Sequence, residues 1–195
     1  MRKSIFIPLL AAAAAVALGA IAQPREGYVT REPGRVGVAQ TVKVTATITA
    51  LDPAARTVTL TGPQGNELTV IAGPEVQNFN QLKRGDRVDV QYAEALLVEL
   101  KKGGGNPVVR TEQSGMASAQ PGGQPGVVGG SKVTVVGDVI ALDAATQQVT
   151  VRGPQRTVSL NVRDPEQFKL IAKGDQLQAT YVEAVAVDVR PAAAK

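Results

Sequence analysis

The chain has 195 residues with no cysteine and no histidine, and its 21 Lys or Arg against 17 Asp or Glu give a formal charge of +4. Without Cys or His, disulfides, thiolate ligands, the commonest general base and the common nucleophile pairs are excluded. The charge is also dispersed, because residues 42–102 and residues 131–191 each hold seven cations and seven anions. We therefore expect no enzyme activity, no cofactor and no nucleic-acid partner.

The first expected element is a signal peptide at residues 1–22. Two cations precede an apolar run from Ile5 to Leu18, and Ala20-Ile21-Ala22 has the small-x-small pattern that signal peptidase reads. The run is shorter than the roughly 20 residues that cross a bilayer. We expect a periplasmic or secreted protein with no transmembrane segment after signal removal; a signal retained as an anchor is the alternative.

The remaining chain contains an internal duplication. ITALDPAARTVTLTGPQ at 48–64 matches VIALDAATQQVTVRGPQ at 139–155, and residues 79–100 match residues 168–189. A stretch rich in Gly, Pro, Ser and Gln separates the copies, which is the composition of a flexible tether, although NPVVRTE within it could pair as an extra strand. The expected parts after the signal are an extended arm (23–41), module 1 (42–102), a flexible linker (103–130), module 2 (131–191) and a tail (192–195).

Within each copy, apolar and polar residues alternate, which indicates half-buried strands. Val42, Val44 and Ala46 fall on one face, and Lys43 and Thr45 on the other. Two shorter alternating stretches and a segment with helical spacing follow in both copies. A last stretch then supplies a fourth and a fifth strand, or one long bent strand. This order predicts an all-β fold of two tandem, small five-stranded OB-like β-barrels, each with one short helix. An open meander or a small SH3-like barrel is the alternative.

The shared frame ALD…VTxxGPQ…F…GDxxxxxYxEA resembles the tandem OB-like modules of secreted envelope proteins of Gram-negative bacteria. It is similar, more distantly, to the periplasmic copper-chaperone barrels. The resemblance implies the barrel fold and no particular activity. The His and Met ligands that copper chaperones use are missing, because the chain has no His and its two methionines, Met1 and Met116, fall in the signal and the linker. No metal site is expected.

Turn positions are repeated between the copies. Arg84-Gly85-Asp86 has the letters of an adhesion motif, but the second copy has Lys173-Gly174-Asp175, so that only Gly-Asp is common to both. Glycine supplies a positive φ, and aspartate can accept hydrogen bonds from the turn backbone. We predict structural turn roles for six residues: Asp52, Gly85, Asp86, Asp143, Gly174 and Asp175.

Tyr92 with Glu94, repeated as Tyr181 with Glu183, forms the candidate ligand site. Counting by twos along the last stretch of each copy places both glutamates in the apolar phase. A carboxylate facing a core needs a partner or a route to solvent. Either each glutamate marks a bend at a barrel rim, or each Tyr/Glu pair contacts a polar ligand.

Two functions follow from this sequence. The first is a non-catalytic binding or scaffold protein of the envelope, whose two tethered modules hold another protein or cell-wall polymer by avidity. The second is a carrier of a small ligand or ion that uses the Tyr/Glu pairs.

Overall fold

The computed structural model describes residues 26–120 and 123–192, so the predicted signal peptide lies outside the described residues. Ten strands form one antiparallel sheet. The strands are β1 (Glu26–Glu32), β2 (Arg35–Asp52), β3 (Thr57–Thr61), β4 (Glu67–Ile71), β5 (Arg87–Lys101), β6 (Arg110–Ser118), β7 (Gly126–Asp143), β8 (Gln148–Arg152), β9 (Thr157–Asn161) and β10 (Gln176–Arg190).

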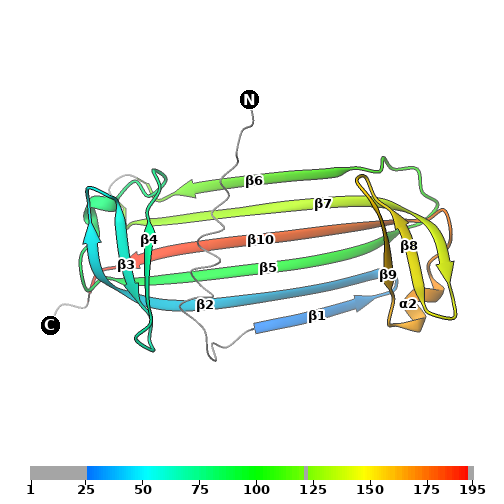
Figure 1. The fold of residues 1–195 in the computed structure, drawn as a ribbon, viewed down its shortest axis with the longest axis horizontal. Helices are drawn as coiled ribbons and strands as arrows, with labels where there is room; N and C mark the ends of the chain where they lie inside the picture. The colour runs from blue at the N-terminus through cyan, green and yellow to red at the C-terminus, as the bar shows by residue number, and fades with distance from the viewer. Residues whose placement is uncertain (1–25, 121–122, 193–195) are drawn as a thin grey trace.

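The strand order is β4-β3-β2-β5-β10-β7-β8-β9, with β1 added beside β2 and β6 added beside β7. In Figure 1 the long strands β2, β5, β10 and β7 run side by side; the β3–β4 hairpin lies at one end and β8, β9 and the helix α2 (Pro165–Lys169) at the other. The all-β prediction is confirmed.

The sheet is open, and the structure shows no pair of separate closed barrels. Strand β5 pairs with β2 of its own copy on one side, but its other side pairs along its whole length with β10 of the other copy, so the sheet of module 1 does not close on itself. Val185 and Val189 of β10 also belong to the apolar cluster of module 1, around Val44, Ile48 and Phe79. The two copies therefore share one sheet and part of one core.

Matching bulges bend both ends of the sheet. The register of β2 with β3 shifts between Ile48 and Ala50, and that of β7 with β8 shifts between Val139 and Ala141, 91 residues later. A bulge bends its strand and increases the local twist. The short hairpins consequently turn away from the long strands and cover the two ends of the sheet.

The segments expected to be an arm and a linker contain regular structure. β1 and the start of β2 lie in the expected arm, and β6 and the start of β7 lie in the expected linker. These segments are poor in apolar residues. They form strands because the backbone of β1 pairs with β2 and the backbone of β6 pairs with β7. Sequence periodicity does not report this source of stability.

The helices of the two copies differ. The expected helix of module 2 is α2, which Asp164 caps by accepting from the N–H groups of Glu166 and Gln167 after Pro165 sets the first turn. Module 1 has only a 3₁₀ turn, η1 (Phe79–Gln81), which begins without a side-chain cap. Where module 2 has the α-helix α2, module 1 therefore has one short 3₁₀ turn, flanked at its start by Asn78.

That asparagine takes part in a reciprocal contact between the copies. Asn78 donates to the carbonyls of Gln120 and Gly123, in the connection between β6 and β7. At the equivalent position, Gln167 accepts from the N–H of Gly34 and donates to the carbonyl of Glu32, in the β1–β2 turn. Each module thus holds the hairpin turn that belongs to the other copy.

Candidate functional site

The site lies where the two copies meet, at the centre of the sheet. The β5–β10 register places Glu94 opposite Glu183. Gln40 of β2 is the neighbour of Glu94 on one side, and Ser131 of β7 is the neighbour of Glu183 on the other. Side chains alternate between faces with a period of two, so these four form a polar row on the face that carries both apolar cores.

Hydrogen bonds join the two predicted Tyr/Glu pairs into one cluster. The Tyr92 hydroxyl lies 3.1 Å from Oε2 of Glu94 and 3.5 Å from Oε2 of Glu183. The Tyr181 hydroxyl lies 3.2 Å and 3.4 Å from the same two oxygens. Each phenol has one proton to donate. Two donors are therefore shared between two carboxylates in a central ring of four side chains.

The outer oxygens of the carboxylates have partners of their own. Gln40 donates its amide N–H to Oε1 of Glu94, and the Ser131 hydroxyl donates to Oε1 of Glu183 at 3.1 Å. All four donors are neutral. In the part of the chain that the structure describes, neither glutamate forms a salt bridge with Lys or Arg. The cluster therefore concentrates negative charge.

Burial raises the pKa of Tyr92 well above the ordinary tyrosine value of about 10, and the Tyr181 hydroxyl and the Glu94 carboxylate raise it further. Burial also raises the pKa of Tyr181; its hydrogen bond with Tyr92 works in the opposite direction, and the charge of Glu94 adds to the increase. Both phenols consequently stay protonated at neutral pH and act as hydrogen-bond donors.

The cluster is open to a ligand on one side. Ser131, Tyr181 and Glu183 line a hollow of about 430 Å³, together with Arg110 and Glu112 of β6. The Arg110 guanidinium is engaged by the Glu112 carboxylate at 2.8 Å. Arg110 is therefore already paired, and Glu183 is the central carboxylate that lines this hollow.

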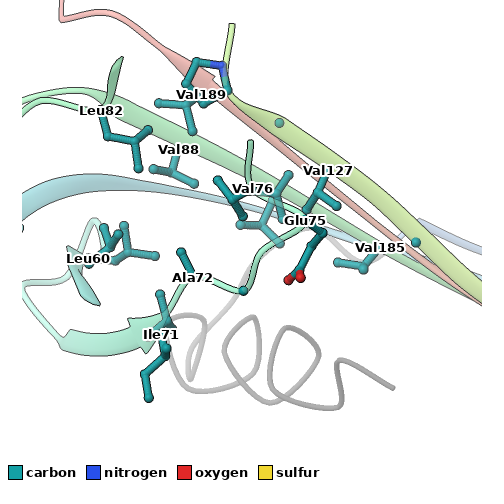
Figure 2. A pocket seen from close by; sticks show the side chains of 18 of the residues that line it. Leu60, Ile71, Ala72, Glu75, Val76, Leu82, Val88, Val127, Val185 and Val189 are labelled. Carbon is teal, nitrogen blue, oxygen red and sulfur yellow. The ribbon is translucent and has the colours of Figure 1, made fainter. Parts of the chain in front are cut away.

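An apolar cavity lies on the module 1 side of the cluster. Its volume is about 190 Å³, and Val76, Val88, Val185 and Val189 lie around it in Figure 2, with Glu75 as the charged side chain among them. Residues from both copies line this cavity. The cavity therefore exists because the two copies share one core, and it does not belong to one module.

The predicted turn residues lie in hydrogen-bonded turns. Asp52 accepts from the N–H groups of Ala54 and Ala55, and Asp143 accepts from those of Ala145 and Thr146. The pKa of Asp143 lies below the usual range, mainly because the Thr146 side chain forms a hydrogen bond with its carboxylate.

The two Gly-Asp turns are also alike. Gly85 and Gly174 both have φ of 94°, a conformation that favours glycine. Asp86 is buried and accepts from the N–H of Lys83, and Asp175 is buried and accepts from that of Ala172. The aspartate of the adhesion-like triplet thus faces its own turn, which leaves it poorly placed to contact a receptor.

Three residues whose side chains make structural hydrogen bonds were not identified from the sequence. Gln40 could have been found by continuing the alternation of β2 backward from Val42, and Ser131 by adding the repeat offset of 91 to Gln40. Gln176, which is 1% exposed, gives no such signal, because its partner Asn106 lies in the segment expected to be flexible.

Within residues 26–120 and 123–192, no group of three or more His, Cys, Asp or Glu is placed to hold a metal ion, and none of the helices has the length and apolar character to cross a membrane. The chain matches no model of a known protein family, and a search of curated proteins finds no match.

Proposed function

We propose that the protein is a non-catalytic binding protein of the cell envelope that takes up a divalent cation at the Tyr92–Glu94–Tyr181–Glu183 cluster. The carrying observation is that Glu94 and Glu183 stand directly opposite each other on paired strands, and that the hydrogen-bond donors to them from the described residues are all neutral. Like charges directly opposite on paired strands destabilise a sheet. A bound cation would remove that repulsion.

The donor atoms favour a hard cation. The carboxylates, the two phenols and the Ser131 hydroxyl offer only oxygen, and the Gln40 amide adds a carbonyl oxygen if it rotates. Calcium accepts six to eight oxygen ligands in flexible geometry and readily includes water, whereas magnesium demands near-ideal octahedral geometry. Ca²⁺ is therefore the cation that the cluster would suit best, with water completing the shell.

We expect Ca²⁺ to bind the parent chain in isothermal titration calorimetry, and Glu94→Gln or Glu183→Gln to weaken binding at least tenfold, or about 1.4 kcal/mol. Each substitution keeps the shape and an acceptor oxygen but removes one charge. The free energy of unfolding without Ca²⁺ should stay equal or rise by about 0.2 to 1 kcal/mol, since the repulsion is relieved.

Glu166→Gln is the matched control, because Glu166 is exposed on α2 and paired with Lys169. It should bind Ca²⁺ like the parent chain. Binding of putrescine but not Ca²⁺ would identify an organic dication as the ligand. If the parent chain bound Ca²⁺, Mg²⁺ and putrescine equally poorly, or if both glutamine variants bound as well as the parent, the proposal would be rejected.

A scaffold role is the second candidate, and the edges of the sheet favour it. Among the described strands, β6 pairs with β7 alone and its side chains are mostly exposed, so its outer edge could pair with a strand of another envelope protein. Cell-wall polymer is the other partner in this proposal. Such a role would use the surface of one continuous sheet and would not require two modules that move independently.

A further inference from the structure

A second cavity on the same face lies at the module 2 end of the sheet. Its volume is about 680 Å³, within the range of about 300 to 1,000 Å³ that small-molecule sites occupy. Its apolar lining comes from β2, β5, β9, β10 and the loops around α2: Val36, Val98, Leu100, Leu160, Val162, Ile171 and Leu177. Leu160 remains 42% exposed, so this apolar lining is incompletely covered.

Three arginines stand among the residues that line this cavity: Arg31 of β1, Arg35 of β2 and Arg163 after β9. Arg35 lies 3.8 Å from Glu99 and 4.0 Å from Glu32. Among the described residues, no ion pair engages Arg31 or Arg163. Asp164, the carboxylate that the described residues contribute to the lining, is occupied as the cap of α2. The cavity thus combines an apolar interior with uncompensated positive charge.

The duplication supplies an internal comparison. In module 2, Val162 follows β9 and donates its N–H to the carbonyl of Gln147, and the next residue is Arg163. In module 1, Ala72 makes the equivalent bond to Arg56, and the next residue is Gly73. Arg35 begins β2, and Gly126 begins β7. Both glycines line the smaller cavity of module 1. The same fold therefore forms without these arginines, so the fold itself does not require them.

The turn that carries Arg31 and Arg35 on its two sides is also held in place. Gln167 of α2 accepts from the N–H of Gly34 at 2.9 Å and donates to the carbonyl of Glu32 at 2.9 Å. These bonds fix the β1–β2 turn against the helix. The backbone positions of Arg31 and Arg35, which flank that turn, are consequently fixed next to the cavity.

We propose that this cavity binds a single-chain amphiphile with an anionic head group. The acyl chain lies along the apolar floor made by β2, β5 and β10, and the head group lies between Arg31 and Arg163. A guanidinium suits this role, because it stays charged at every accessible pH and can bind a carboxylate through two parallel hydrogen bonds.

The test compares three ligands that share a twelve-carbon chain and differ in head group: laurate, dodecyltrimethylammonium and dodecyl maltoside, each below its micelle concentration. We expect laurate to bind the full chain at least tenfold more tightly than the other two. The double variant Arg31→Gln, Arg163→Gly, which puts the residue of module 1 at position 163, should bind laurate no better than dodecyl maltoside.

Arg156→Gln, in the exposed β8–β9 turn, is the matched control and should keep laurate affinity. Glu94→Gln should keep it too, which separates this site from the cation site. Equal affinity for the three ligands, or laurate binding that survives in the double variant, would overturn the proposal. So would co-sedimentation with phosphatidylglycerol vesicles in the absence of laurate binding, since this would indicate a membrane surface as the partner.

Discussion

Replacing Gln176 by leucine is expected to lower the free energy of unfolding by about 3 kcal/mol. Its side chain is 1% exposed and uses both ends: Oε1 accepts from the backbone N–H of Asn106 at 3.1 Å, and Nε2 donates to the Asn106 carbonyl at 2.7 Å and to Asp138 at 2.8 Å. Leucine has a similar volume but removes the partners of the Asn106 N–H and carbonyl, and each lost partner costs about 1 to 3 kcal/mol. Asp138 keeps its bond from Arg152.

Urea unfolding monitored by circular dichroism measures this change. Gln178→Leu is the control on the same face of β10, because Gln178 is half-buried and makes one long bond of 3.3 Å to Glu99. It should cost much less than Gln176→Leu. Equal losses in the two variants would mean that segment 103–106 is not anchored to β10 in solution.

Replacing Asp175 by alanine should lower the free energy of unfolding by about 3 kcal/mol at pH 7. The carboxylate is 5% exposed and accepts from the N–H groups of Ala172 at 2.8 Å and Gly103 at 3.1 Å and from the Lys102 ammonium at 2.8 Å. Alanine offers none of these acceptors, so two backbone N–H groups lose their partners. Asp143→Ala, in an exposed turn, is the control and should cost much less.

The same aspartate makes stability depend on acid pH. Burial opposes ionisation of Asp175, but the bonds from Lys102, Gly103 and Ala172 outweigh it and hold its pKa below the usual range. Its contribution is complete above the unfolded pKa of about 3.9 and is lost as the pH falls through the lower folded value. The difference in unfolding free energy between the parent chain and Asp175→Ala should therefore shrink between pH 5 and pH 2.

Both predictions concern the way in which the chain leaves module 1. Lys102 ends module 1, and Gly103 and Asn106 open the segment expected to be a flexible linker, yet these residues bind Asp175 and Gln176 at the start of β10. Glycine-rich composition predicts freedom in the unfolded chain, and a buried Gln or Asp elsewhere in the sequence can still anchor such a segment. Composition alone carries no information about that partner.

The sequence predicts local structure well in this protein. The alternation that places Val42, Val44 and Ala46 on one face holds in β2, and the two short stretches after it form β3 and β4 in one copy and β8 and β9 in the other. The duplication is visible in the matched bulges at Ile48 and Val139. These features depend on neighbours in the chain.

The pairing of the two copies through β5 and β10 could not be predicted from the local sequence pattern. An alternating strand such as β5 has the same pattern whether its partner is a strand of its own module or β10, because period and phase are properties of one strand. The individual Tyr/Glu pairs were therefore identified as candidates, but their union into one cluster depends on the register of Glu94 with Glu183. A single pair at a barrel rim and a four-residue cluster at a junction have the same sequence pattern.

The most direct test of this account is a disulfide across the junction. Ala93 of β5 stands opposite Ala184 of β10, and the chain has no cysteine of its own. Directly opposed residues of antiparallel strands have Cα atoms about 4.5 to 5.5 Å apart, which a disulfide can bridge. The account predicts that Ala93→Cys, Ala184→Cys forms an intramolecular disulfide in the monomer under mild oxidation, while Ala93→Cys, Ala145→Cys does not. A pair that remains reduced, or crosslinks only between molecules, would contradict a shared sheet and the site built on it.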